Sequence, residues 1–202
     1  MPGPRRAGRP LASSRAMLEE AAGELFLERG YAATSVADVT QRAGVSRSTF
    51  FNYFETKSDL LWAAFDDAVR TLAARLEAGT APGEATGEAA VSAGAQAYAG
   101  LRELAAGLPA DHVALAFTQA EAMGLGPELR VAAARRTADV GDVLTEHARA
   151  HGVPPLAARV AGTAWAGALV AAVEAWARAG ADRTALATLL DEALVPVRSA
   201  LP

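Results

Sequence analysis

Cysteine and isoleucine are absent from the sequence, and Lys57 is its only lysine. A chain without cysteine has no disulfide, no thiolate nucleophile and no cysteine-ligated zinc or iron–sulfur site, which favours a reducing compartment. No uninterrupted apolar run approaches the roughly 18 to 20 residues that a membrane span needs, and no apolar segment follows the arginines of residues 1–9 as in a signal peptide. The sequence therefore predicts a cytoplasmic protein that is neither secreted nor bound to a membrane.

The abundant residues favour helices. Alanine makes up about a quarter of the 202 residues, while aromatic residues account for 6% and β-branched residues are few. Nothing reads as a strand, so the fold class expected is all-α, with one large or two small domains. The net charge of −4 argues against a general polyanion binder.

Positive charge is concentrated near the N-terminus. Residues 1–57 contain eight basic and six acidic residues, a net charge of +2, which leaves −6 for the remainder. Arg5, Arg6 and Arg9 precede every acidic residue, in a segment too rich in proline and glycine to fold alone. Residues 1–12 are predicted to be a flexible basic arm, which is either a solvated tail or a segment that contacts nucleic-acid phosphates or a minor groove.

Three short helices are expected over residues 13–56. Ser13 and Ser14 fit the start of the first helix, and Gly30 its end. Its apolar positions recur with the helical period: Leu18, Ala21, Ala22, Leu25 and Phe26. Ser35 and Asp38 form a capping pattern for a second helix that ends at Gly44, and Ser46 caps a third almost immediately. Two short helices joined by so tight a turn indicate a helix-turn-helix.

The third helix has an unusual outer face. Phe50 and Phe54 are spaced to face the core, which leaves Arg47, Ser48, Phe51 and Asn52 on the opposite side. A major groove presents both hydrogen-bonding base edges and thymine methyl groups, which suits a face that mixes polar and aromatic side chains. Thr56 and Asp59 then open a much longer fourth helix that reaches about Ala78.

Residues 13–65 resemble the TetR family of transcriptional regulators. The resemblance is carried by ERGY, ATSVADV and QRAGVSRSTFFNYFETKSDLL, in that order. It implies that the recognition helix faces DNA, that Thr34 and Lys57 hold phosphates, and that the protein is a homodimer on a palindromic operator. Many family members have tyrosine in place of Phe51, so here a ring without a hydroxyl is expected against a sugar or a thymine methyl. The full DNA-contacting set is Thr34, Ser35, Arg47, Ser48, Thr49, Phe51, Asn52, Tyr53 and Lys57, with Arg5, Arg6 and Arg9 of the arm.

Residues 57–202 are predicted to form a second helical domain for ligand binding and dimerisation. Glycine- and proline-rich breaks divide it into five further helices, about nine in the whole chain. These breaks fall at residues 79–88, 107–111, 124–127, 151–155 and 179–183.

The segment 156–179 is apolar nearly all round. Its bulky residues are expected to face inward, whereas its small ones suit close contact with a second copy of the chain. The predicted dimer interface consists of Val160, Gly167, Val170, Ala171, Leu186 and Leu190. Burial of both sides within one subunit is the alternative.

In the TetR family, helices of the second domain enclose an effector cavity. The resemblance therefore predicts an effector site on the corresponding helices of this chain. Its candidate residues, for each of which core packing is the alternative, are Tyr98, Leu101, Leu104, Phe117, Glu121, Met123 and Trp165. The segments ARVAG, LVAAVEAW and LDEAL resemble the subset of regulators with an acyl-CoA-like-ligand domain, which implies a small lipophilic, acyl-type effector.

No catalytic constellation is found, so an enzyme is not expected, and neither is a cofactor. His147 and His151 have the spacing of a metal-binding pair but no third ligand. We therefore predict a repressor released from its operator by an effector. The alternatives are a regulator or activator that needs no effector, and an enzyme or carrier built on a helical bundle.

Overall fold

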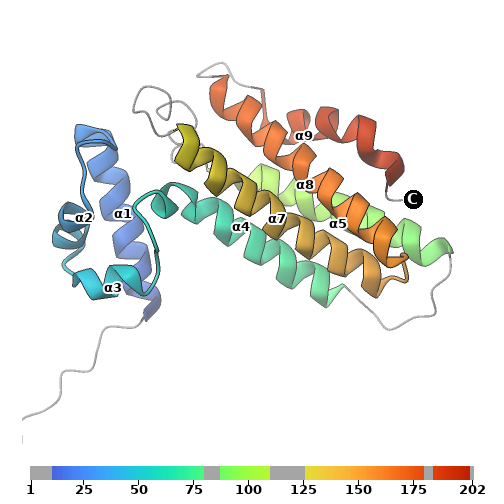
Figure 1. Cartoon of the computed structure of the whole chain (residues 1–202), viewed down its shortest axis with the longest axis horizontal. Coiled ribbons are helices and arrows are strands. Elements are labelled where there is room, and N and C mark those ends of the chain that lie inside the picture. The colour runs from blue at the N-terminus through green and yellow to red at the C-terminus, as the bar shows by residue number, and fades with distance from the viewer. Residues whose placement is uncertain (1–10, 80–86, 110–125, 180–183, 201–202) are drawn as a thin grey trace, which may run out of the picture. The chain divides into compact units, whose positions relative to one another are not determined.

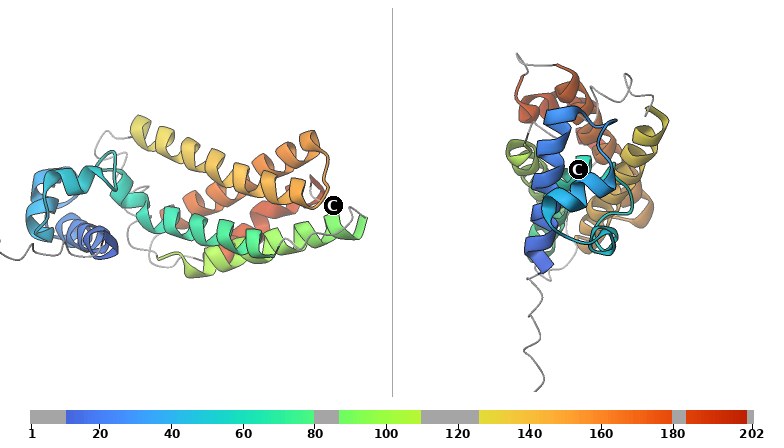
Figure 2. Two further views of the ribbon diagram at one scale, coloured as in Figure 1. Left: turned by 90° about the horizontal axis from the view of Figure 1, so that it is seen from below. Right: turned by 90° about the vertical axis from the view of Figure 1, so that its left-hand side faces the viewer.

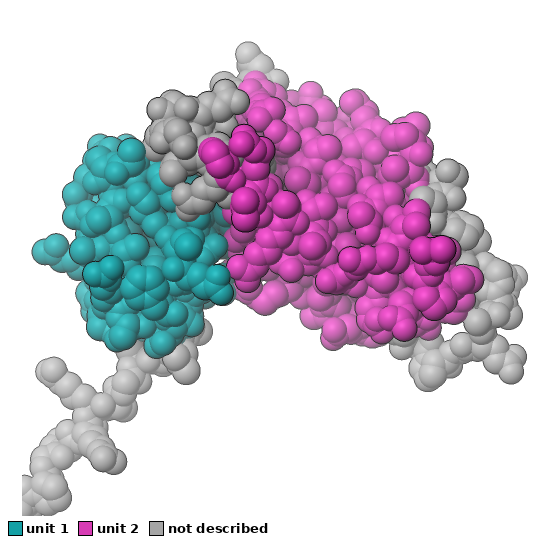
Figure 3. Space-filling model, in the orientation of Figure 1, with its two compact units in different colours: residues 1–63 teal, residues 64–202 magenta. Residues whose placement is uncertain are grey.

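A computed structural model describes residues 11–79, 87–109, 126–179 and 184–200 of the chain. Within these ranges every regular element is a helix, as expected for an all-α protein (Figure 1, Figure 2). The chain divides into two compact units, residues 1–63 (unit 1) and residues 64–202 (unit 2), which Figure 3 shows in different colours. This division falls inside the fourth helix, a few residues after the boundary expected at residue 56.

Unit 1 contains the three short helices: α1 (Leu11–Arg29), α2 (Val36–Ala43) and α3 (Arg47–Phe51), followed by the start of α4 (Asp59–Ala78). All five apolar positions predicted for the first helix are buried, and so are Phe50 and Phe54. The start of the first helix was predicted wrongly. Because α1 begins at Leu11, Ser13 and Ser14 lie inside its first turn and do not precede it.

The predicted caps of α2 are both present. The Ser35 hydroxyl accepts the backbone N–H of Asp38 at 3.2 Å, and the Asp38 carboxylate accepts the backbone N–H of Ser35 at 2.8 Å. Hydrogen bonds from the side chain and backbone of Ser35 lower the pKa of Asp38. At the other end, Gly44 has a φ of +66°, a left-handed conformation that glycine adopts without strain. These two caps place α3 directly after α2.

Unit 2 contains most of α4 and four further helices, α5 (Gly87–Gly107), α7 (Gly126–Ala150), α8 (Pro155–Arg178) and α9 (Leu186–Leu194), followed by the 3₁₀ helix η1 (Val195–Ala200). The breaks predicted from glycine and proline coincide with the ends of these helices. A helix was also expected between residues 111 and 124, but that segment lies outside the described residues.

Helix α8 lies at the centre of unit 2, against α7, α9 and η1. By length and composition alone it could cross a membrane, with a mean hydropathy of 1.5 over its most apolar window. Half of that window is buried inside the protein. The buried side includes Gly162, Trp165, Leu169, Val173 and Trp176, so the bulky residues of this segment face inward as expected, and α8 is the core helix of this unit.

The crossing of α7 and α8 depends on a glycine. A Cβ atom on Gly162 of α8 would lie 2.6 Å from the carbonyl oxygen of Gly141 and would also overlap the Thr145 hydroxyl, both on α7. That hydroxyl already donates to the Gly141 carbonyl at 2.6 Å. Backbone thus meets backbone at this point, and no side chain fits between the two helices.

We predict that Gly162→Ala destabilises unit 2 by about 1–3 kcal/mol, because the added methyl group forces the helices apart. Gly141→Ala is the matched control at the same crossing, since its Cβ would meet its nearest neighbours at an ordinary 3.7 Å. That variant should be neutral or stabilised by up to about 1 kcal/mol through helix propensity. Urea unfolding followed by circular dichroism compares the two, and equal midpoints would contradict the prediction.

Candidate nucleic-acid interface

The outward side of α3 carries the side chains that the sequence placed there. Arg47, Ser48, Phe51 and Asn52 are exposed, and Thr49 and Tyr53 are half-buried. The helix is shorter than expected, because it ends at Phe51 and Asn52 occupies its C-cap. The backbone N–H groups of Tyr53 and Phe54 still bond to the Phe50 carbonyl, at 2.9 and 3.0 Å. This turn keeps Asn52 beside the helical residues of the face.

Hydroxyl groups cluster where α3 begins. The Ser46 side chain accepts the backbone N–H of Thr49 at 3.1 Å, and its oxygen lies 2.8 Å from the hydroxyls of both Ser48 and Thr49. The cap therefore fixes the first turn of α3. It also directs two of the predicted DNA-contacting side chains, Ser48 and Thr49, toward the N-terminal end of the face.

Most of the arginines of residues 11–63 are bound to carboxylates. Arg15 pairs with Glu19 at 2.7 Å, and Arg29 pairs with Asp38 at 3.5 Å. Arg42 is the most heavily engaged, since its two terminal nitrogens contact Glu24 and Glu28 across the α1–α2 boundary, each at 2.7 Å. The hydrogen bond from Arg42 also lowers the pKa of Glu28.

Arg47 differs from these arginines. Within residues 11–63 it forms no ion pair, and its guanidinium lies 5.7 Å from the centre of the Phe51 ring. The Phe51 side chain is 49% exposed, although the adjacent Phe50 is fully buried. An exposed cation without a carboxylate partner, stacked on an exposed aromatic ring, is available to an external polyanion.

Two residues predicted to hold phosphates have other roles in the structure. The Thr34 side chain is only 1% exposed, and its hydroxyl donates to the Gly30 carbonyl at 2.9 Å. The Lys57 ammonium donates to the carbonyls of Tyr31 and Thr34, both at 2.8 Å, and lies 3.8 Å from the centre of the Tyr31 ring. In this arrangement both side chains serve the turn between α1 and α2, so the phosphate role predicted for them is not supported. Ser35 is exposed but used as a cap, and Arg5, Arg6 and Arg9 lie outside the described residues.

A groove of about 450 Å³ lies between α4 and α5 in unit 2. Leu104, one of the predicted effector residues, lines it together with Leu72, Ala68 and the ion-paired Arg75 and Glu103. The other predicted residues within the described ranges serve the core. Leu101 is fully buried, the Tyr98 hydroxyl donates to Asp191 of α9 at 2.7 Å, and Trp165 Nε1 donates to the Val197 carbonyl at 3.3 Å. Phe117, Glu121 and Met123 lie outside the described part of the chain.

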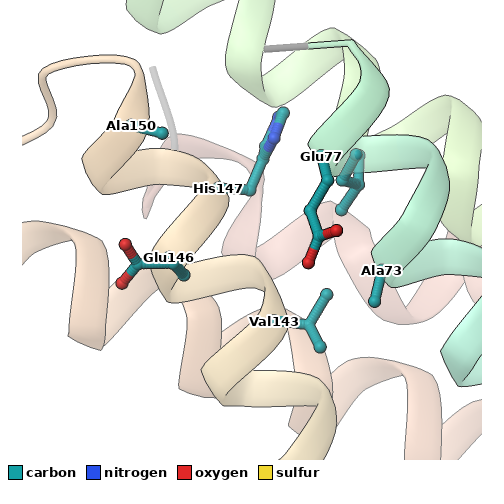
Figure 4. A pocket seen from close by; sticks show the side chains of 7 residues that line it. Ala73, Glu77, Val143, Glu146, His147 and Ala150 are labelled. Atoms are coloured by element: carbon teal, nitrogen blue, oxygen red, sulfur yellow. The ribbon is translucent and has the colours of Figure 1, made fainter.

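A smaller cavity of about 110 Å³ lies between α4 and α7, lined in part by Glu77, Glu146 and His147 (Figure 4). His147 Nε2 donates to the Ala93 carbonyl at 3.3 Å, and Nδ1 has no hydrogen-bond partner among the described residues. Burial lowers the pKa of His147, and the neighbouring His151, whose ring centre is 4.4 Å away, lowers it further. Across the described ranges no group of three acidic or histidine side chains is arranged to hold a metal.

The predicted dimer residues fall into two groups. On α8, Val160 and Ala171 are exposed, Val170 is half-buried, and a Cβ on Gly167 would meet nothing within 4 Å. On α9, Leu186 and Leu190 are buried within the subunit, so their assignment to the interface was wrong. The apolar side of α9 is used against α8 and α5.

Comparison with known proteins identifies the helix-turn-helix. Residues 18–64 match the family model of bacterial regulatory proteins, tetR family. The N-terminal region of the chain is thus similar to the DNA-binding region of TetR-family regulators. The HTH-type transcriptional repressor DhaR of Mycobacterium sp. (strain GP1) is 38% identical over 72 residues, which are 34% of this chain and 36% of the relative. The chain thus matches about a third of the length of that curated relative.

Solved structures extend the similarity to the whole fold. Thermus thermophilus FadR, a repressor solved with lauroyl-CoA, has a TM-score of 0.62 at 24% identity, covering 93% of this chain and 95% of FadR. SmeT in complex with triclosan has a TM-score of 0.53 at 18% identity, covering 92% and 91% of the two chains. At these identities the similarity shows the fold alone, and it extends over both units of this chain.

We predict that Lys57→Met destabilises unit 1 by about 1.5–3 kcal/mol, because two carbonyls lose a charged donor. Arg47→Met is the matched control, since it removes one positive charge from a similarly long side chain that has no ion pair within residues 11–63. Its stability should stay within about 0.5 kcal/mol of the parent protein. Thermal unfolding of both variants measures the difference. A phosphate-binding lysine without a structural role would instead leave the two melting temperatures equal.

Proposed function

We propose that the protein is a transcriptional repressor of the cytoplasm that binds a palindromic operator as a homodimer and is released by a small lipophilic effector. The observation that carries the DNA-binding part is the outer face of α3. There an exposed arginine without an ion pair among residues 11–63 lies beside an exposed phenylalanine and short polar side chains. Arginine and asparagine are the side chains that bond guanine and adenine edges in the major groove.

The exposed stripe of α8 supports a homodimer. Leu156 and Val160, which are 78% and 56% exposed, continue at helical spacing into Thr163, Gly167 and Ala171. A row of apolar and small residues suits close contact with the same helix of a second copy about a two-fold axis. A two-fold protein in turn matches a palindromic site, with half-sites about 34–36 Å apart or at a multiple of that spacing.

The groove between α4 and α5 supports a lipophilic effector. Its volume of about 450 Å³ lies within the range of small-molecule sites, and leucine, alanine and glycine make up much of its lining. Lauroyl-CoA and triclosan are bound by the structurally similar FadR and SmeT. Each ligand has a large apolar part, the acyl chain of lauroyl-CoA and the chlorinated rings of triclosan, so we propose an effector with such a part, with an acyl compound as the first candidate.

We predict that DNA selected from a random pool by the wild-type protein is bound specifically, and that Arg47→Ala costs about 1–3 kcal/mol per half-site. Arg47→Ala should lower the ratio of specific to non-specific affinity, because Arg47 is proposed to bond a base edge. Arg29→Ala removes the same charge from an arginine paired with Asp38, and it should keep this ratio. Fluorescence anisotropy at several salt concentrations measures both affinities. A helical enzyme or carrier would select no sequence at all.

Dimerisation is tested on the same DNA. Gly167→Trp places a large ring on the open side of α8 and should give monomers that lose operator binding, whereas Val131→Trp, on an exposed position of α7, should leave both properties intact. Sedimentation equilibrium reports the oligomeric state. A dimeric Gly167→Trp protein would mean that the interface lies on another surface.

We predict that lauroyl-CoA weakens operator binding by the wild-type protein, and that Ala68→Trp, which fills the groove, abolishes this response. Ala74→Trp carries the same ring on an exposed position of α4 and should respond like the wild type. A hundredfold release requires about 2.7 kcal/mol of differential affinity, and operator DNA must weaken lauroyl-CoA binding by the same factor. Calorimetry with and without operator checks this reciprocity, with triclosan as a second probe. Unchanged operator affinity with both probes would favour the regulator that needs no effector.

A further inference from the structure

Phe51 stands out among the residues of the exposed α3 face. Its neighbours Arg47, Ser48 and Asn52 carry hydrogen-bonding groups, whereas the phenyl ring carries none. Phe51 therefore cannot bond to a phosphate or to the polar edge of a base. The apolar group that a major groove offers to such a ring is the 5-methyl group of thymine.

The ring is also held in place from two sides. It packs edge-to-face with the fully buried Phe50, at a centroid distance of 5.2 Å and an interplanar angle of 84°. The guanidinium of Arg47, one helical turn away, lies 5.7 Å from its centre. Contacts with a buried ring and a stacked cation restrict the ring before any DNA is bound, and such pre-organisation reduces the entropy lost on binding.

Arg47 and Phe51 are four residues apart on one helix, so their Cβ atoms are about 5–6 Å apart. Successive base pairs rise by about 3.4 Å along the DNA axis, so the two side chains span one or two base-pair steps. We infer that the two residues act as one reading unit, in which Arg47 bonds a guanine and Phe51 covers the methyl group of a thymine within two base pairs of it. This inference rests on the DNA-binding function proposed above.

The test removes single methyl groups from the DNA. Each thymine of the selected half-site is replaced in turn by deoxyuridine, which keeps the base pair and loses only the methyl. With wild-type protein, one replacement within two base pairs of a guanine should weaken binding about fourfold per half-site, the effect of one buried methyl group. With Phe51→Ala the same replacement should have no effect. Leu27→Ala, which removes an exposed apolar side chain of α1, should behave like the wild type.

A second variant and a second base separate readout from folding. Phe51→Leu keeps an apolar side chain and should retain part of the sensitivity to deoxyuridine, and the melting temperatures of all variants are compared in parallel. The wild type should bind DNA with 5-methylcytosine at the same position more tightly than DNA with cytosine there. Phe51→Ala should bind the two DNAs equally well. The inference is overturned if no deoxyuridine weakens wild-type binding, or if the loss is equally large with Phe51→Ala. Failure of the proposed function gives a different result, namely that no sequence is selected.

Discussion

The ammonium group of Lys57 holds together the parts of unit 1 that position α3. It bonds the carbonyls of Tyr31 and Thr34, in the turn that leads from α1 to α2, and it lies in the connection between α3 and α4. Thr34 reinforces the same turn from the inside through its bond to the Gly30 carbonyl. Because α3 has only five residues, its own backbone bonds cannot fix its direction. The direction comes from Phe50 in the core, the Ser46 cap before the helix, and the Lys57 contact after it.

Charge pairing in unit 1 follows a second constraint. Arg42 joins α2 to two glutamates of α1, and Arg29 joins α1 to Asp38 of α2. Such exposed pairs contribute little to the free energy of folding, but they occupy side chains that would otherwise contact DNA without regard to sequence. They leave Arg47 as the described arginine of unit 1 with no carboxylate partner. The same pairs thus help to orient α1 and α2, and among the described arginines of unit 1 they leave the unpaired positive charge on α3.

Local signals in the sequence predicted much of the fold. The capping box at Ser35 and Asp38, the left-handed Gly44 and the buried apolar side of α1 each depend on residues a few positions apart. Contacts across long stretches of sequence could not be predicted in this way. Lys57 bonds residues 23 and 26 positions away, and the Tyr98 hydroxyl bonds Asp191, 93 positions away. The helical period placed Leu186 and Leu190 correctly on the apolar side of α9. It could not show whether that side is covered by helices of the same subunit or by a second copy of the chain.

Internal neutralisation of the arginines has a kinetic consequence. Rapid association with DNA comes from a positive potential that extends beyond the protein surface, and paired arginines contribute little to such a potential. The folded part of unit 1 therefore supplies weak long-range attraction, so its encounters with DNA depend on diffusion and orientation. The time that the protein stays on a site then depends on the contacts made after docking. Unrelated DNA offers fewer such contacts than the proposed operator, so the protein dissociates from unrelated DNA faster. Under the proposed function, the protein would spend little time on foreign sequences and would distinguish its operator through slow release.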